Sequence, residues 1–311
     1  MLEFARALAV EAGRMLLAGY EDVSARSVDY KGRRDLVTDV DRRVETMLGE
    51  RLQAACPDDA ILGEEGVRRS GRSGCVWIID PLDGTTNFVH GHPLFCTSIA
   101  RARGFRPGAA CFGEGKGEGE AAPATDPLAS GFFAPGPPPE IEVGVIVAPV
   151  LRETYRAQRG EGAWLGERRL HVSATERLEQ ALVATGFAYR RNELTNANLE
   201  SFRRLALRAR GIRRGGAAAL DLAYTAAGRL DAYWEPYLKP WDVAAGILLV
   251  TEAGGRVTDF GGQARALDGV EVLATNGRLH DPVRRLLERA DASWAPSERR
   301  RLREERPQRD E

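Results

Sequence analysis

The sequence predicts a mixed α/β protein in which helices and sheets form layers. Two amphipathic helical patterns open the chain, and short apolar strand patterns follow them. From about residue 181 onward strand and helix patterns alternate, which is typical of a layered α/β arrangement. With 311 residues, the chain is long enough for one large domain or two ordinary ones. We expect an N-terminal α+β half over residues 1–150, a C-terminal α/β half over 151–290, and a disordered charged tail over 291–311.

The composition excludes several classes of protein. The net charge of −1 gives no basic field for binding nucleic acid directly. The four cysteines form no C-x-x-C pair, so they suit neither a zinc knuckle nor a disulfide framework, and a reducing cytoplasm is the simple inference. No apolar run approaches the ~20 residues that a membrane span needs.

The first half opens with two helices. Residues 2–18 place apolar side chains on one helical face, and a second stripe runs from Thr38 to about Ala55. Thr38 can cap the second helix, with Asp41 in its first turn, where the helix dipole favours negative charge. Stabilising the helix start is the explanation for Asp41 that these residues themselves offer. Residues 29–36 between the helices are basic and turn-like.

Two short strands follow, and each ends on an acid. Ile61–Leu62 leads to Glu64, and the apolar run 76–79 leads to Asp80. Residues 66–75 between them are polar and predict a mobile loop. The stretch 95–100 reads as a further strand.

Residues 113–139 have a different composition from the rest of the chain. They contain six glycines and six prolines, so this segment cannot bury a core and is predicted to be a flexible loop. Strand patterns then resume, beginning with 142–148 and a hairpin partner at 152–158.

The second half alternates strands and helices. The predicted strands are 160–165 (with a turn), 181–185, 212–214, 230–234 and 270–274, and the predicted helices are 196–209, 217–227, 241–253 and 282–290.

The end of strand 76–79 is the stretch with the clearest chemistry. Asp80 and Asp83 stand three residues apart, and Gly84 then permits a tight turn into Thr85-Thr86-Asn87, which are good residues for starting a helix. Carboxylates bind a hard cation, and the free N–H groups of a helix start bind an anion. A metal-bound phosphate would satisfy both, whereas the alternative is a surface turn with two solvated aspartates.

Four motifs together resemble the inositol monophosphatase family of magnesium-dependent, lithium-sensitive phosphatases. In chain order they are Asp35-Leu36-Val37-Thr38-Asp39-Val40-Asp41, Ile61-Leu62-Gly63-Glu64-Glu65, Trp77-Ile78-Ile79-Asp80-Pro81-Leu82-Asp83-Gly84-Thr85-Thr86, and Lys239-Pro240-Trp241-Asp242 with Glu252-Ala253-Gly254-Gly255. The resemblance covers about residues 1–290. It implies an αβαβα sandwich of the inositol monophosphatase and fructose-1,6-bisphosphatase type, commonly dimeric. Relatives cross residues 113–139 with a tight hairpin, so this segment is an insertion.

The resemblance also implies a site for two or three Mg²⁺ ions, with Li⁺ as an inhibitor. One metal would be held by Glu64, Asp80 and the Leu82 carbonyl, and the second by Asp80, Asp83 and Asp242. These ligands are all oxygen atoms, which suits Mg²⁺.

Further residues follow from the same resemblance. Asp41 and Thr85, together with Glu64, would activate the attacking water, and the N–H groups of Gly84 and Thr85 would hold the phosphate. The substrate's hydroxyl side would meet a wall of four residues, namely Asp83, Gly216, Ala218 and Glu235. Ala217 stands where relatives often carry Ser or Thr, so one hydroxyl contact is absent.

The resemblance implies hydrolysis of inositol monophosphate or a related sugar or polyol phosphate. Fructose-1,6-bisphosphatase, histidinol-phosphate phosphatase and nucleotide 3′-phosphate phosphatase use the same metal ligands and stay open as alternatives. Some bacterial relatives also act as partners of the transcription machinery, which is the rival from a different functional class.

Overall fold

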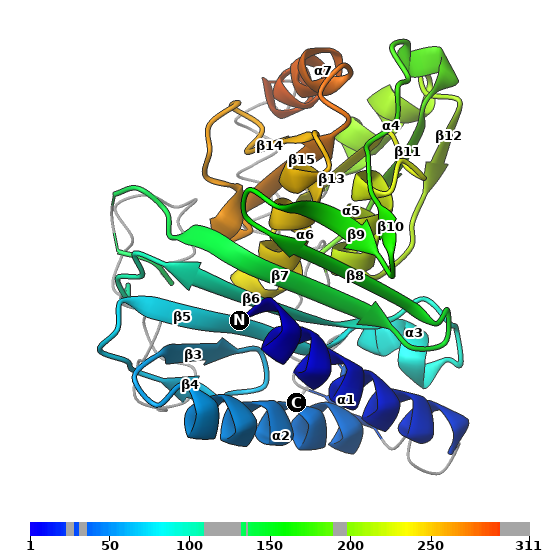
Figure 1. Cartoon of the computed structure of the whole chain (residues 1–311). Helices are drawn as coiled ribbons and strands as arrows, with labels where there is room; N and C mark the ends of the chain where they lie inside the picture. The colour runs from blue at the N-terminus through cyan, green and yellow to red at the C-terminus, as the bar shows by residue number, and fades with distance from the viewer. Residues whose placement is uncertain (23–27, 31–35, 109–131, 135, 189–197, 293–311) are drawn as a thin grey trace, which may run out of the picture.

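The computed structural model describes residues 1–22, 28–30, 36–108, 132–134, 136–188 and 198–292. Five layers follow one another through the molecule, helix, sheet, helix, sheet and helix (Figure 1). This arrangement confirms the predicted αβαβα sandwich. In the described part of the chain, no helix is long and apolar enough to cross a membrane.

The first helical layer consists of α1 (Leu2–Glu21) and α2 (Asp39–Ala55). Their apolar stripes are buried against one face of the first sheet, as the periodicity predicts. The basic segment between them includes β1 (Val28–Tyr30) and β2 (Leu36–Thr38), which pair antiparallel. The prediction of a simple turn over 29–36 is therefore wrong at both of its ends, and Lys31, Arg33 and Arg34 lie outside the described residues.

The first sheet has eight strands in the order β10-β9-β8-β7-β6-β5-β3-β4. Only β3 and β5 run parallel, and all other neighbours are antiparallel. The strands are β3 (Ala60–Gly63), β4 (Arg68–Arg69), β5 (Cys75–Asp83), β6 (Cys96–Arg103), β7 (Glu140–Ala148), β8 (Glu153–Gln158), β9 (Gly162–Leu165) and β10 (Arg168–Arg169). The division into halves at residue 150 stays a prediction, and the sheet order places β8, β9 and β10 with the strands of the first half.

Alternation along β5 explains how one strand serves two layers. Trp77 and Ile79 are buried in the core against α1 and α2, whereas Val76 and Ile78 are buried in the core on the opposite face. Successive side chains of a strand point to opposite faces, so a continuous apolar run marks a sheet that is covered on both sides.

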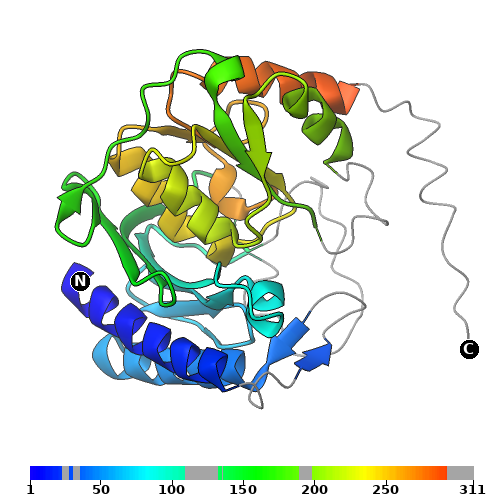
Figure 2. The ribbon, with the colours of Figure 1, turned by 90° about the vertical axis from the view of Figure 1, so that its right-hand side faces the viewer.

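The middle layer and the second sheet complete the C-terminal half (Figure 2). Helices α5 (Ala218–Ala226) and α6 (Pro240–Glu252) lie between the two sheets and share one core with both. The second sheet has the order β12-β11-β13-β15-β14. Its strands are β11 (Leu182–Thr185), β12 (Gly211–Arg213), β13 (Ala232–Pro236), β14 (Arg256–Thr258) and β15 (Glu271–Thr275).

The outer helices α4 (Leu199–Ala206) and α7 (His280–Ala292) cover the far face of the second sheet, and two 3₁₀ turns, Leu178–Gln180 and Ala266–Asp268, join other elements. Predicted helix 196–209 is shorter at its C-terminal end because a turn follows Ala206, and its start adjoins the undescribed residues 189–197. The tail beyond Ala292 also lies outside the described residues.

Two loop predictions need correction. The loop 66–75, predicted to be mobile, contains β4. The N–H groups of Arg72 and Ser73 donate to the Asp58 carbonyl at 2.7 and 3.0 Å. The predicted flexible insertion 113–139 is ordered at its C-terminal end, where the Phe132 side chain is buried in the central core. An aromatic residue can anchor a segment that glycine and proline otherwise keep out of a core. Residues 113–131 and Pro135 lie outside the described part.

Candidate active site

The tip of β5 brings Asp80 and Asp83 to one place. In a regular strand residues three apart point to opposite faces. The pairing of β5 with β6 is irregular between these two residues, and such a bulge redirects a side chain. Asp80 is buried, and one of its carboxylate oxygens accepts a hydrogen bond from the N–H of Leu82 at 3.0 Å.

Glu64 reaches the same place from the neighbouring strand. The parallel register pairs Gly63 with Ile79, so Glu64 follows β3 at the level where Asp80 follows on β5. The Glu64 side chain forms a hydrogen bond with Asp80. The turn after Glu64 is stabilised by Glu45, a buried acid on α2 that accepts a hydrogen bond from the N–H of Glu65 at 2.7 Å.

Asp83 is held by the start of α5. Its carboxylate accepts from the N–H of Ala219 at 2.7 Å. The N-cap residue of α5, Ala217, has no side chain that could cap the helix, so Asp83 satisfies a first-turn N–H group from a distant segment. Burial raises the pKa of Asp83 to about 6, and the N–H groups of α5 oppose that rise.

Asp242 comes from the start of α6, where Pro240 occupies the first helical turn. Its carboxylate accepts from the N–H of Lys239 at 2.7 Å, so it does cap its own helix. Although its side chain is only half-buried, desolvation by the surrounding protein raises the pKa of Asp242 to about 8, and the nearby charge of Asp83 adds to the rise. The structure thus brings together carboxylates that lie more than 150 residues apart in sequence.

These acids form a cluster of neighbouring carboxyl groups. Burial raises the pKa of Asp80 well above its ordinary value, and the charges of Glu64, Asp83 and Asp242 raise it further. Within the described residues, no Lys or Arg forms an ion pair with Asp80, Asp83 or Asp242. Such a cluster calls for a cation, and its oxygen-only donors have the chemistry that Mg²⁺ prefers.

The carboxylates lie close together, but they are not arranged as ligands around one point. Among the described residues, no three His, Cys, Asp or Glu side chains converge in the arrangement that would hold a metal ion. The physical reason is visible in the hydrogen bonds, because Asp83 is turned to the N–H of Ala219 and Asp242 to the N–H of Lys239. Repulsion between like charges favours this separation.

Thr85 and Asp41 meet beside the cluster. The Thr85 hydroxyl lies 3.3 Å from a carboxylate oxygen of Asp41 and 3.1 Å from the Leu82 carbonyl, and it has one proton to donate to either. Asp41 is buried and also accepts from the N–H of Thr38 at 2.9 Å, so it caps α2 as well. Both explanations offered for Asp41 by the sequence are therefore compatible with its position.

Gly84 connects this group to the C-terminal half. Its φ of 94° is a left-handed conformation that favours glycine, and it serves as the N-cap of α3 (Thr85–Val89). A Cβ at this position would lie 3.2 Å from the Cβ of Ala217 and 3.0 Å from the carbonyl of Leu94. The close approach of Gly84 to Ala217 therefore places the start of α3 next to the start of α5.

The predicted substrate-side residues line the same region. Burial raises the pKa of Glu235 to about 7, and the hydroxyl of Tyr233 donates to Glu235 at 2.7 Å. The charge of Glu235 also contributes to the raised pKa of Asp242, which shows that the two are near each other. Ala218 lies in the first turn of α5, and Gly216 precedes it with a φ of 85°.

Two residues of this region were missed by sequence reasoning. The Asn87 side chain donates to the carbonyls of Leu94 and Gly215 at 2.6 and 2.9 Å, which joins α3 to the loop before α5. Asp221 on α5 is buried and accepts from the N–H of Gly215, so both backbone groups of Gly215 are hydrogen-bonded to side chains. The available signal was an acid inside the apolar pattern 217–227, whereas Asn87 looked like an ordinary helix-start residue.

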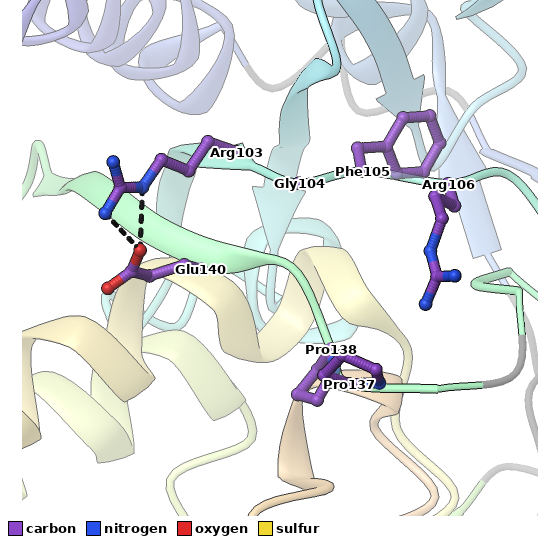
Figure 3. A pocket seen from close by; sticks show the side chains of 7 residues that line it. All are labelled: Arg103, Gly104, Phe105, Arg106, Pro137, Pro138 and Glu140. Carbon is purple, nitrogen blue, oxygen red and sulfur yellow. Dashed lines mark hydrogen bonds and ion pairs between the residues drawn. The ribbon is translucent and has the colours of Figure 1, made fainter.

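A surface crevice of about 610 Å³ lies elsewhere, beside the insertion (Figure 3). Its lining residues are Arg103, Gly104, Phe105, Arg106, Pro137, Pro138 and Glu140. Arg103 is at the opposite end of β6 from the acids and pairs with Glu140, so its charge is already offset. We therefore assign the chemistry to the carboxylate cluster, and not to this crevice.

The chain is similar to known proteins over most of its length. A family model described as the inositol monophosphatase family matches residues 1–112 and 139–292. The chain is 42% identical to a Nus factor SuhB of Pseudomonas aeruginosa, covering 89% of this chain and 91% of the relative, and 37% identical to an inositol-1-monophosphatase of Synechocystis, covering 92% and 88%. A crystal structure of the extragenic suppressor protein suhB from Bartonella henselae has a TM-score of 0.76 at 36% identity, covering 92% and 97%. The chain belongs to the inositol monophosphatase family.

Proposed function

We propose that this protein hydrolyses inositol monophosphate, or a related sugar or polyol phosphate, with two or three Mg²⁺ ions. Its family is one of phosphatases, and its relatives include proteins called inositol-1-monophosphatase. The observation that carries the proposal is that Glu64, Asp80, Asp83 and Asp242 come from three distant segments into one region, where burial raises the pKa of the three aspartates. The residues Glu64, Asp80, Asp83 and Asp242, with the Leu82 carbonyl, would hold the metal ions.

Each remaining residue has a defined task in this proposal. When bound, Mg²⁺ supplies positive charge to the phosphate and lowers the pKa of a water molecule. Asp41 holds the Thr85 hydroxyl so that its oxygen accepts a hydrogen bond from the attacking water, and Glu64 orients that water from the other side. The N–H groups of Gly84 and Thr85, at the start of α3, donate to phosphate oxygens.

The alcohol side of the substrate would lie between the two halves of the site. Glu235 and Asp83 would accept hydrogen bonds from hydroxyl groups, while Gly216 and Ala218 form a wall that leaves room for a ring. This wall supports a polyol or sugar phosphate, because several carboxylates face it and few cations do. A second phosphate, as in fructose 1,6-bisphosphate, would have to meet Arg214, whose charge lowers the pKa of Glu235.

A phosphate-release screen tests the proposal. Inositol monophosphate, fructose 1,6-bisphosphate, histidinol phosphate and a nucleotide 3′-phosphate are each incubated with the protein in millimolar-range Mg²⁺, with EDTA, and with added Li⁺. We expect release from inositol monophosphate or a polyol phosphate, none with EDTA, and inhibition by Li⁺. Full activity of a metal-free sample contradicts the metal requirement, and preference for another substrate selects one of the alternatives.

Several relatives carry a name that favours a second role. The Pseudomonas aeruginosa protein is called a Nus factor, and this chain is 42% identical to it. We propose that the chain also binds the transcription machinery, in the cytoplasm and with a homodimer as its resting form. Pull-down with RNA polymerase tests this, using wild type and Asp242→Asn. Retention of both proteins supports a role independent of catalysis, and retention of neither contradicts it.

A further inference from the structure

The C-terminal end of the insertion is attached to the rest of the protein at residues 132–134, here called the insertion root. The N–H of Gly108 donates to the Phe132 carbonyl at 3.0 Å, and the N–H of Ala134 donates to the Arg106 carbonyl at 2.9 Å. An isolated bridge also pairs Pro107 with Phe133. The family model passes over this root, since its match stops at residue 112 and resumes at 139. The root is therefore a feature of this chain that family membership does not explain.

Neighbouring side chains of the root go to different places. The Phe132 ring is buried and packs edge-on against Trp241, with ring centroids 5.2 Å apart. The Phe133 ring is only partly buried and packs edge-on against Phe105 at 6.2 Å. Successive side chains in extended backbone point in opposite directions, which accounts for the difference. Figure 3 shows the surroundings of this second contact, with Phe105 and Arg106 on the segment after β6 and Pro137 on the segment before β7.

The Phe132 ring also touches two cations, and each belongs to a segment of the active site. The Arg68 guanidinium carbon lies 5.4 Å from the ring centroid, and Arg68 is in β4, which pairs with the strand that leads to Glu64. The Lys239 ammonium lies 5.9 Å from the centroid, and the backbone N–H of Lys239 donates to Asp242. Trp241 directly precedes Asp242. One ring thus contacts both segments that supply carboxylates from opposite sides of the site.

We propose that Phe132 is a positioning residue that fixes the start of α6 relative to the β3–β4 turn, and so sets the spacing of Asp242 and Glu64 for metal binding. This inference rests on the proposed function, because it assigns those carboxylates to metal ions. The acids repel one another before metal binds. An uncharged ring that holds the β3–β4 turn and the start of α6 at a fixed separation therefore lowers the free-energy cost of rearranging them when metal binds. The ring does this without contacting metal or substrate.

The test compares Phe132→Ala with Phe133→Ala, which removes a neighbouring ring of the same root that packs against Phe105. Two quantities are measured for each purified full-length variant. One is the Mg²⁺ concentration that gives half of the maximal thermal stabilisation without substrate, and the other is the Mg²⁺ dependence of phosphate release. For Phe132→Ala we expect both Mg²⁺ concentrations to rise about tenfold, the low end of the range for loss of a residue that orients a metal ligand. The rate at saturating Mg²⁺ should stay within about twofold of wild type.

Phe133→Ala should lower the melting temperature without changing the Mg²⁺ requirement. Phe132→Tyr should keep the wild-type Mg²⁺ requirement, because the ring is retained. If Phe132→Ala does not fold, Phe132→Leu and Phe133→Leu make the same comparison with more of the apolar volume kept. If the Phe132 and Phe133 variants need the same Mg²⁺ concentration, the inference is overturned and Phe132 has a packing role. Wild type without any Mg²⁺-dependent phosphate release would instead overturn the proposed function, and the thermal measurement separates the two failures.

Discussion

The Thr85 hydroxyl lies within hydrogen-bonding distance of the Asp41 carboxylate, at 3.3 Å, although the two residues are 44 positions apart in the chain. Both side chains are buried beside the acids at the tip of β5. Asp41 at the same time caps α2, so its removal would affect two functions at once. Substitutions that separate these functions give the first prediction.

Thr85→Ala should lower kcat roughly 10²-fold or more, the scale of a general-base contribution, with a much smaller change in the Mg²⁺ requirement. Thr85→Ser, which keeps the hydroxyl, should recover most of the rate. Asp41→Asn should also lose rate while still capping α2, whereas Asp39→Asn, an exposed neighbour in the same helical turn, should not. Steady-state phosphate release measures all four variants, and a kcat within about twofold of wild type for Thr85→Ala returns the pair to a structural role.

Asp242→Asn should leave the fold intact because asparagine can still accept from the N–H of Lys239. It removes an anionic oxygen, so most activity should be lost and the remainder should need much more Mg²⁺. Circular dichroism, thermal melting and a Mg²⁺ titration measure these changes. Asp281→Asn is the control, because Asp281 lies in the first turn of α7, on the far face of the second sheet. Wild-type rate and Mg²⁺ dependence in Asp242→Asn would remove this residue from the site.

Mg²⁺ binding should release protons between about pH 6 and pH 8. In the folded, metal-free protein, burial raises the pKa of Asp83 to about 6 and that of Asp242 to about 8. These two carboxyl groups therefore retain protons that they have already lost in the unfolded chain. Because the native state binds more protons than the unfolded state in this range, stability of the metal-free protein falls as pH rises through it. The thermal shift caused by Mg²⁺ should therefore be larger at pH 8 than at pH 5.5.

Calorimetry in two buffers of different ionisation enthalpy counts the released protons. Asp242→Asn should release fewer than wild type. A Mg²⁺ titration whose heat does not depend on the buffer at pH 7, or a thermal shift that shrinks as pH rises, contradicts this prediction.

Acid should destabilise the protein through His280, far from the active site. His280 is buried at the start of α7, with its ring nitrogens 2.9 Å from the Thr258 hydroxyl and 3.0 Å from the Thr275 hydroxyl. Burial lowers the pKa of His280 from 6.5 to about 4. The unfolded chain therefore binds a proton that the native state does not, so the contribution is complete above pH 6.5 and is lost as pH falls toward 4.

The loss is at most about 3.5 kcal/mol, at ~1.4 kcal/mol for each unit of pKa. Urea unfolding of wild type at pH 7.5 and pH 5, compared with His280→Asn, isolates this contribution, since asparagine cannot titrate. The variant should be less stable at pH 7.5 but should lose less on acidification. An equal loss in both proteins would show that other groups govern the acid response.

The sequence by itself predicted most of the helices and strands. Apolar periodicity predicted α1, α2, α5 and α6 to within a few residues, because a helix that buries one face needs that spacing. The run before Asp80 predicted a buried strand, which the structure covers on both faces, and the four motifs predicted the family, which comparison confirmed. These features are local, so nearby residues carry the information for them.

Tertiary structure decided which residues meet and how. Ala217 cannot cap α5, and only packing of the two halves shows that Asp83 takes over that hydrogen bond. The insertion had the composition of a flexible loop, yet Phe132 is buried against Trp241. Contacts of this kind join segments that are more than 100 residues apart, and they depend on the accumulated packing of every layer between them. Local sequence cannot encode such a contact, because its energy is gained only after the chain has closed around it.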